Sequence, residues 1–308
     1  MIRKTLTFNG FDNVYFSEEE FTVPAGWTRL TMEYSTISPG TELFCIREGG
    51  ERKPGYIMVG RKDDGSRVFV FPSMKESEAA HCNLRALSPD SLLIPLPEEF
   101  PAEYAGFLRF INIGMHPFNN VDTLPERVAV IGLGPVGNLA AQTARNFGCR
   151  VLGIDPSEAR RRLANCCGIA ETGTPEEFAA LRNEFEQVID TVSAPSTLLA
   201  SGHALKNGGT CSMVGIVKSG TLDSQEFLNL SWQRGIRFVS GWEMLNPMPL
   251  TERNILRGIN WISRGSYELK PLLTGILKPD PDTLSAAYNN LAADPDNHIC
   301  YVIDWHNG

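Results

Sequence analysis

The stretch that decides the fold is VAVIGLGPVGNLAAQTARNFG, residues 128–148. Its first four residues form an apolar run typical of a buried strand, and the pattern Gly132-x-Gly134-x-x-Gly137 then opens an amphipathic helix. Gly132 permits a tight turn, Gly134 removes a Cβ that would block a diphosphate, and Gly137 lets the helix lie close to the sheet. The sequence therefore predicts a dinucleotide-binding turn at the amino end of a helix.

The next strand ends at Asp155, 23 residues after Gly132. A carboxylate at this position binds the hydroxyls of the adenosine ribose and repels a 2′-phosphate, so NAD is favoured over NADP. The run Arg160 to Arg162 follows, and a guanidinium there could instead serve a 2′-phosphate. Because Asp155 is present, we favour the interpretation of these arginines as a solvated helix face.

Strand and helix patterns alternate from about residue 115 to 265, which predicts a doubly wound parallel sheet in an α/β domain. Before it, residues 1–114 show short β-rich runs separated by Pro and Gly clusters. The tail, residues 266–308, ends in an apolar strand and is expected to return to this first domain. The predicted division is a Rossmann domain over 115–265 and a β domain made of 1–114 and 266–308.

Composition narrows the possible partners. Twenty-eight Lys and Arg residues against 36 Asp and Glu residues give a formal charge of −8, the wrong sign for broad binding to nucleic acid. Neither a signal peptide nor an apolar stretch of membrane-spanning length is recognisable, so we expect a cytoplasmic protein with no membrane partner. Seven cysteines without any C-x-x-C pair indicate reduced thiols rather than disulfides or a zinc ribbon.

Several segments together resemble the medium-chain dehydrogenase/reductase superfamily, in its zinc-type alcohol and polyol dehydrogenase branch. They are YSTISPGTEL (34–43), PGYIMVGR (54–61), SRVFVF (66–71), the glycine segment, VLGIDPSEARR (151–161) and the tail. The resemblance implies a co-chaperonin-like β-barrel joined to the Rossmann domain and an NAD(P)-dependent oxidoreductase acting on CH–OH or C=O groups. It also implies a small-molecule substrate and a homo-oligomer, dimer or tetramer, joined through the nucleotide domain near the strand that begins at Ile236.

The same resemblance locates the positions where zinc members carry their catalytic ligands. Pro39 stands at the cysteine position, Tyr56 at the histidine position, and Arg109, counted back from His116, at the third. None of these side chains is a usual zinc ligand, so we expect no catalytic metal. The four-cysteine lobe of a structural zinc is also missing.

Without zinc, another group must stabilise charge on the substrate oxygen and move its proton. The candidate catalytic residues are Thr41, Tyr56 and Arg109, of which Thr41 matches the hydroxyl that relays the proton in zinc members. The candidate cofactor ligands come from the glycine turn and from strand ends along the carboxyl edge of the sheet: Gly132, Gly134, Pro135, Val136, Gly137, Asp155, Arg160, Ser193, Gly215 and Trp242.

Two alternatives remain open. The chain could be a non-catalytic NAD(P)-binding protein that acts as a sensor or assembly partner. It could also be a zinc enzyme with unorthodox ligands such as Glu42, Cys45 or His81. The adjacent pair His81-Cys82 is otherwise interpreted as packing, because neighbouring residues on a strand point to opposite faces.

Overall fold

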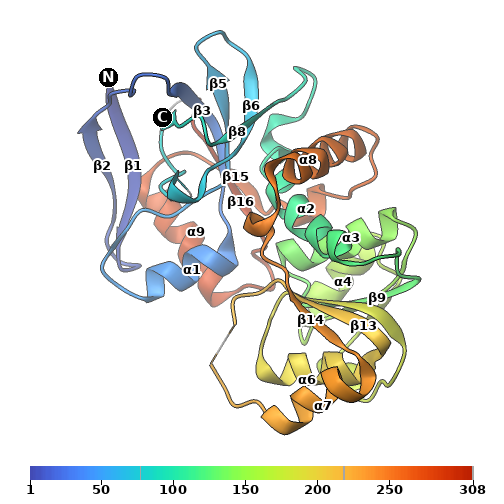
Figure 1. Cartoon of the computed structure of the whole chain (residues 1–308). Helices are drawn as coiled ribbons and strands as arrows, with labels where there is room; N and C mark the ends of the chain where they lie inside the picture. The colour runs from blue at the N-terminus through green and yellow to red at the C-terminus, as the bar shows by residue number, and fades with distance from the viewer. Residues whose placement is uncertain (77, 218, 307–308) are drawn as a thin grey trace. The chain divides into compact units, whose positions relative to one another are not determined.

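The computed structural model describes residues 1–76, 78–217 and 219–306 (Figure 1). The chain forms two compact units. Unit 1 comprises Met1–Arg109, Ile255–Ser263 and Leu272–Gly308, and unit 2 comprises Phe110–Asn254 and Arg264–Pro271. Two helices, α2 (Phe107–Met115) and α8 (Met248–Ser263), are divided between the units. The division of the chain at residues 114/115 and 265/266 stays a prediction.

Unit 2 is built on one parallel sheet. Its strands are β9 (Arg127–Ile131), β10 (Arg150–Ile154), β11 (Glu171–Gly173), β12 (Phe185–Asp190), β13 (Leu205–Met213) and β14 (Arg237–Ser240). They lie in the order β11-β10-β9-β12-β13-β14, and every neighbouring pair is parallel. This is the doubly wound order, so the predicted fold class is confirmed.

Helices cover both faces of this sheet. They are α3 (Pro135–Asn146), α4 (Glu158–Cys166), α5 (Pro175–Ala179), α6 (Pro195–Ala204) and α7 (Ser224–Arg234). Neighbouring residues of β9 face opposite ways: Val128 packs in one core cluster with Ala140 of α3, and Ala129 packs in another with Leu198 of α6. Figure 1 shows α3 and α4 on one side of the strands and α6 and α7 on the other. Burial on both faces explains the continuous apolar runs in the sequence.

Unit 1 contains two sheets. The larger joins β15 (Gly275–Leu277), β16 (Tyr301–Asp304), β3 (Thr28–Thr36), β5 (Met58–Lys62), β6 (Arg67–Phe71) and β8 (Leu92–Pro95) in that order, with β7 (Leu84–Leu87) also paired to β3. The smaller joins β2 (Val14–Glu20), β1 (Ile2–Asn9) and β4 (Glu51–Arg52). The tail strand β16 pairs antiparallel with β3, which confirms that the carboxyl end completes the β domain.

Two helices of unit 1 position the candidate site. These are α1 (Pro39–Arg47) and α9 (Pro281–Ala293), which pack on the core cluster through Leu43 and Tyr288. Short 3-10 helices span Met74–Glu76, Ala102–Tyr104, His116–Asn120, Glu243–Leu245 and Lys270–Leu272. Among the helices of the described ranges, none is both long and apolar enough to cross a membrane.

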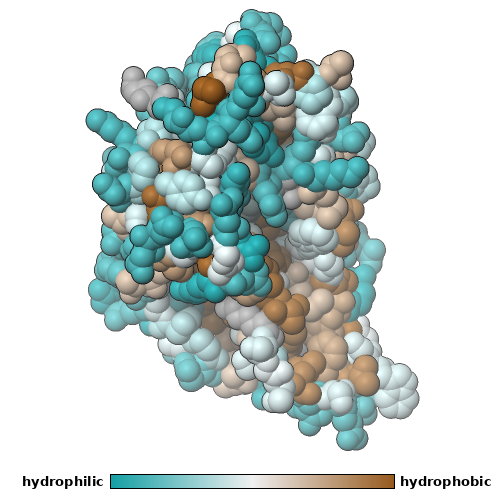
Figure 2. All heavy atoms as spheres, turned by 90° about the vertical axis from the view of Figure 1, so that its left-hand side faces the viewer, coloured by the Kyte–Doolittle hydropathy of each residue, from teal (hydrophilic) through white to brown (hydrophobic). Residues whose placement is uncertain are grey.

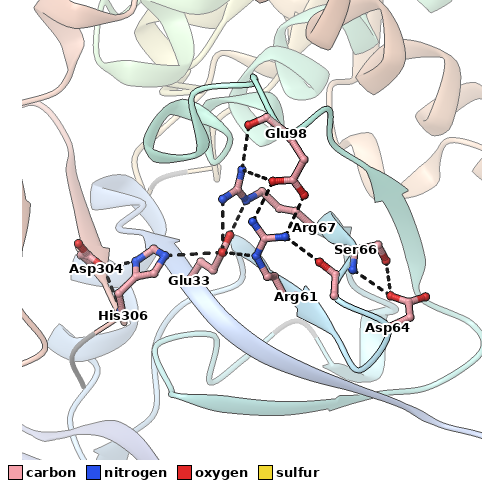
Figure 3. A network of polar contacts seen from close by, with 9 residues as sticks. Glu33, Arg61, Asp64, Ser66, Arg67, Glu98, Asp304 and His306 are labelled. Carbon is pink, nitrogen blue, oxygen red and sulfur yellow. Dashed lines mark hydrogen bonds and ion pairs between the residues drawn. The ribbon is translucent and has the colours of Figure 1, made fainter.

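A network of ion pairs links the neighbouring strands β3, β5 and β6 of the larger sheet (Figure 3). Glu33 of β3, which is buried, accepts hydrogen bonds from Arg61 at 2.7 Å and from Arg67 at 2.5 Å. Arg61 also pairs with Glu98, and His306 lies 3.6 Å from Glu33. Burial by itself raises the pKa of Glu33, but the hydrogen bonds and charges of Arg67 and Arg61 outweigh it, so the pKa lies below its usual value.

The substitution Glu33→Gln should therefore remove stability at neutral pH. Because the folded-state pKa is lowered, the ionised carboxylate stabilises the fold above its ordinary pKa of 4.5, and this contribution is lost as pH falls through the lower folded value. We expect the free energy of unfolding at pH 7 to fall by about 1–2 kcal/mol, with Arg61 partly screened by solvent. Urea unfolding between pH 3 and 7 measures this as a flatter pH dependence. The exposed pair Arg162–Glu158 supplies the control Glu158→Gln, which should change little.

Candidate functional site

The glycine turn has the geometry that the sequence predicts. Gly132 has a φ of 85°, in the left-handed region, and an added Cβ there would lie 2.5 Å from Thr191 Oγ1. A Cβ on Gly137 would lie 1.7 Å from the carbonyl oxygen of Gly132, so only glycine lets α3 approach this closely. The N-cap of α3 is Gly134, which has no side chain to occupy the N–H groups of the first turn. These groups and the helix dipole suit a diphosphate.

Thr191 holds this turn from the neighbouring strand. Its hydroxyl donates to the carbonyl of Ile131 at 2.7 Å and lies 3.2 Å from that of Gly132. Thr191 follows β12, which is the strand beside β9 where the sheet order reverses. The turn therefore lies at the topological switch point, the usual place for a ligand in such a sheet.

Asp155 lies directly behind the turn. The carboxylate is 4% exposed, accepts the backbone N–H of Leu133 at 2.8 Å, and accepts that of Ser157 at 2.9 Å. Asp155 thus ties the end of β10 to the phosphate-binding turn as well as offering a carboxylate to a ribose. The link to Leu133 is a contact that sequence spacing did not predict.

The three arginines after Asp155 have different surroundings. An amino group of Arg160 lies 3.9 Å from Asp155 Oδ2 and would be 3.5 Å from a Cβ on Gly134, so this guanidinium borders the turn. Arg161 donates to the carbonyl of Asp155, and Arg162 pairs with Glu158 on the surface. The solvated-face interpretation therefore suits Arg162 but not Arg160.

The remaining predicted cofactor residues follow strand ends of the same sheet. Ser193 has a φ of 51°, and its N–H donates to Asp190 Oδ1 at 2.8 Å. Gly215 lies against the carbonyl of Thr191, where a Cβ would come within 2.5 Å. Trp242 follows β14 and is 49% exposed. Pro135 and Val136 form the first turn of α3. Their roles as cofactor ligands stay predictions.

In unit 1, the structure brings Tyr56 and Arg109 together. The guanidinium carbon of Arg109 lies 5.1 Å from the ring centroid of Tyr56 and 4.1 Å from that of Phe71. Arg109 is 3% exposed, so a cation is held in an aromatic, largely dehydrated surrounding. Such a cation can stabilise negative charge on a phenol or on an oxygen bound beside it.

The hydroxyl of Tyr56 is itself hydrogen-bonded to Ser38 Oγ at 2.9 Å. Ser38 is the N-cap of α1, and Thr41 lies half-buried in the first turn of the same helix. The pair Ser38–Tyr56 was not predicted. The resemblance directs attention to Thr41 in the same segment, and nothing in the spacing distinguishes the two hydroxyls.

Glu42 and His81, suggested as alternative zinc ligands, instead contact each other. His81 Nε2 lies 3.0 Å from Glu42 Oε2, and both side chains are buried. No group of three or more His, Cys, Asp or Glu side chains able to hold a metal ion occurs within residues 1–76, 78–217 and 219–306. Pro39, Tyr56 and Arg109, at the positions where the resemblance locates zinc ligands, are not usual zinc-binding residues. The absence of a catalytic zinc stays a prediction.

Comparisons with known proteins now place the chain. Residues 135–247 match the family model described as zinc-binding dehydrogenase. Over 130 residues the sequence is 30% identical to the aldehyde reductase YahK of Escherichia coli (strain K12), which covers 41% of this chain. Within this segment the chain is similar to zinc-binding dehydrogenases. The resemblance identified in the sequence is confirmed.

Solved dehydrogenase structures align with nearly the whole chain. L-idonate 5-dehydrogenase from Escherichia coli covers 99% of this chain and 98% of its own, with a TM-score of 0.82 and 14% identity. An Escherichia coli CFT073 structure described as a short chain alcohol dehydrogenase complexed with NADH covers 98% and 99%, with a TM-score of 0.83 and 16% identity. At such identity the likeness shows the fold. The sequence alignment with YahK spans only 36% of that reductase.

Proposed function

We propose that the protein is a metal-free, NAD-dependent dehydrogenase or ketoreductase that transfers hydride between nicotinamide and a small or medium alcohol or ketone. The observation that carries the proposal is the phosphate-binding turn at the switch point, with Asp155 behind it. Gly132, Gly134 and Gly137 would hold the diphosphate, and Asp155 would hold the adenosine ribose. Names of relatives such as aldehyde reductase and L-threonine 3-dehydrogenase support the reaction class.

The chemistry assigned to this chain is proton handling on the substrate oxygen. When bound, the nicotinamide supplies the hydride acceptor or donor. The Tyr56 hydroxyl would exchange a proton with the substrate oxygen, and Ser38 would hold that hydroxyl in place by the 2.9 Å hydrogen bond. Arg109 would stabilise the negative charge that develops there. Thr41 stays a candidate for relaying the proton outward.

Two measurements test the proposal. Calorimetric titration with NAD and NADP should show uptake of NAD, and a panel of alcohols and ketones monitored by nicotinamide absorbance should reveal hydride transfer. Elemental analysis of protein purified without chelator should find zinc far below one ion per chain. Stoichiometric zinc would overturn the metal-free part, and NAD binding without turnover on the panel would favour the sensor alternative.

Cofactor preference gives a sharper prediction. With Asp155→Asn, NAD binding should weaken about tenfold and the preference for NAD over NADP should shrink by about tenfold to a hundredfold, because repulsion of a 2′-phosphate is removed beside Arg160. Dissociation constants for both dinucleotides measure this. Arg162→Ser is the matched control, since that side chain is 76% exposed and paired with Glu158. An unchanged ratio of the two constants in Asp155→Asn would remove Asp155 from discrimination.

Self-association through unit 2 is proposed from its surface. β14 is the last strand in the sheet order, and exposed apolar side chains lie on the neighbouring α7, including Leu228 at 63% and Trp232 at 83% exposure. Figure 2 shows brown, apolar spheres gathered on the lower part of the view, over unit 2. A second copy would cover this surface.

Trp232→Glu should therefore shift the protein from an oligomer toward monomer, because a charge would enter the covered surface. Sedimentation velocity across a range of concentrations measures the change. Trp27→Glu, on unit 1 at a residue 38% exposed, should leave the distribution unaltered. A parent protein that sediments as a monomer at every concentration would contradict the proposed assembly.

A further inference from the structure

A buried polar network lies beneath the Ser38–Tyr56 pair. The Glu42 carboxylate, 1% exposed, is contacted by three donors: the N–H of Ser38 at 2.8 Å, His81 at 3.0 Å, and the hydroxyl of Tyr288. The burial of Tyr288 and the charge of Glu42 hold the Tyr288 pKa well above its usual value, so the phenol keeps its proton and donates. Three donors satisfy the carboxylate inside the core.

The other nitrogen of His81 extends the network. His81 Nδ1 lies 2.8 Å from Ser35 Oγ, which accepts the indole N–H of Trp305 at 2.9 Å. When Nε2 donates to the Glu42 carboxylate, Nδ1 is left as the acceptor for the Ser35 hydroxyl proton. Each group in the chain from Trp305 to Glu42 then has a consistent partner, which fixes the imidazole ring.

The fixed ring sets the backbone before Tyr56. A Cβ on Gly55 would lie 2.7 Å from His81 Cδ2, so the imidazole packs directly on this glycine, whose φ is 99°. The N–H of Ala80 also donates to the carbonyl of Gly55 at 3.0 Å. The backbone that carries the Tyr56 side chain is therefore held in place by the segment that contains His81.

Glu42 holds Ser38, the other residue of the Ser38–Tyr56 pair, in place. Ser38 is the N-cap of α1, but its side chain makes no capping hydrogen bond. The Glu42 carboxylate accepts a hydrogen bond from the backbone N–H of Ser38, and the Ser38 hydroxyl is hydrogen-bonded to Tyr56. An N-cap serine ordinarily uses this hydroxyl on its own helix. Here the Ser38 hydroxyl is instead hydrogen-bonded to Tyr56, which lies outside this helix.

We propose that Glu42 and His81 are positioning residues that hold the Ser38 hydroxyl against the Tyr56 phenol for proton transfer. The proposal rests on the proposed function, in which Tyr56 exchanges the substrate proton. The buried contact between His81 and Glu42 connects the imidazole that packs on Gly55, the residue before Tyr56, with the helix that follows Ser38. Well-packed apolar side chains would often give comparable or greater stability than such a buried polar pair, so stability alone does not account for it.

The test compares His81→Phe, which keeps a ring against Gly55 but no hydrogen bonds, with His81→Gln, whose amide can still donate to Glu42. The first readout is the ring-carbon resonance of Tyr56 in protein labelled at the tyrosine Cζ. The chain has seven tyrosines, and Tyr56→Phe assigns the signal. The second readout is kcat and KM on the best substrate of the alcohol and ketone panel, and the third is NAD affinity.

In His81→Phe we expect the Tyr56 resonance to move and kcat to fall about 100-fold, with KM and NAD affinity within a factor of three. His81→Gln should return the resonance toward its original position and recover at least a tenth of the parent kcat. His203→Phe, at a half-buried histidine paired with Glu226 in unit 2, is the matched control and should change none of these.

If His81→Phe does not fold, Glu42→Gln, which keeps the side-chain volume, should shift the Tyr56 resonance instead. An unmoved Tyr56 resonance in folded His81→Phe or Glu42→Gln would overturn the proposal, as would a failure of His81→Gln to rescue. Absence of NAD binding in the parent would reject the proposed function separately. The resonance would still decide whether the network positions Tyr56.

Discussion

Replacing Gly137 by alanine is expected to abolish dinucleotide binding. The new Cβ would lie 1.7 Å from the carbonyl oxygen of Gly132 and 2.8 Å from its carbon, both backbone atoms that cannot rotate away. Helix α3 must shift or the turn must open, and either change removes the first-turn N–H groups from the diphosphate. We expect NAD affinity to fall at least 100-fold in calorimetric titration, with about 1–3 kcal/mol lost from folding stability.

A control lies at the other end of the same helix. Gly148 has a φ of 88° and open space around its Cβ position, so Gly148→Ala introduces backbone strain without obstructing a ligand. It should cost about 1 kcal/mol of stability and leave NAD affinity unchanged. If Gly137→Ala takes up NAD within threefold of the parent, the turn does not bind the diphosphate as proposed.

Arg109→Met is expected to give the largest loss of catalysis. Methionine can fill the apolar surroundings of Phe71 but brings no charge to the Tyr56 ring, so stabilisation of a developing oxyanion is lost. We expect turnover to fall about 100- to 1000-fold, as when one donor is removed from an oxyanion site. Steady-state kinetics on the best substrate of the panel measure this, and NAD affinity should be retained.

The matched control is a second cation over an aromatic ring. The Arg257 guanidinium carbon lies 5.9 Å from the ring centroid of Trp261, and both residues belong to α8. Arg257→Met should alter turnover less than twofold. Full activity of Arg109→Met would show that Arg109 does not stabilise the substrate oxygen. It would favour a different set of catalytic residues.

Local spacing predicted the nucleotide half of the molecule well. Strand, turn, helix and acid lie within 28 residues, from Val128 to Asp155, and each carries its own sequence signal. The clamp by Thr191 and the Asp155–Leu133 contact were not predicted, because they join strand ends that are adjacent only in the sheet.

The β half shows the opposite balance. The resemblance located Tyr56 and Arg109, which the structure places together, but it carried no information on Ser38. His81 was interpreted as packing from its alternation with Cys82, and burial is confirmed, since both are fully buried. Its bond to Glu42 crosses 39 residues of sequence. Such pairings form only in the tertiary structure, so the periodicity of the sequence does not predict them.

The place of β16 between β15 and β3 has a consequence for biosynthesis. The strand that fills this interior position of the larger sheet, Tyr301–Asp304, leaves the ribosome after unit 2, whereas its partner β3 leaves before it. Unit 2, apart from Arg264–Pro271, emerges in one uninterrupted run between them and can fold while β3 still exposes an unpaired edge. During translation, the edge of β3 that later pairs with β16 therefore stays unpaired until unit 2 has emerged. An exposed strand edge of this kind is a site that chaperones can protect.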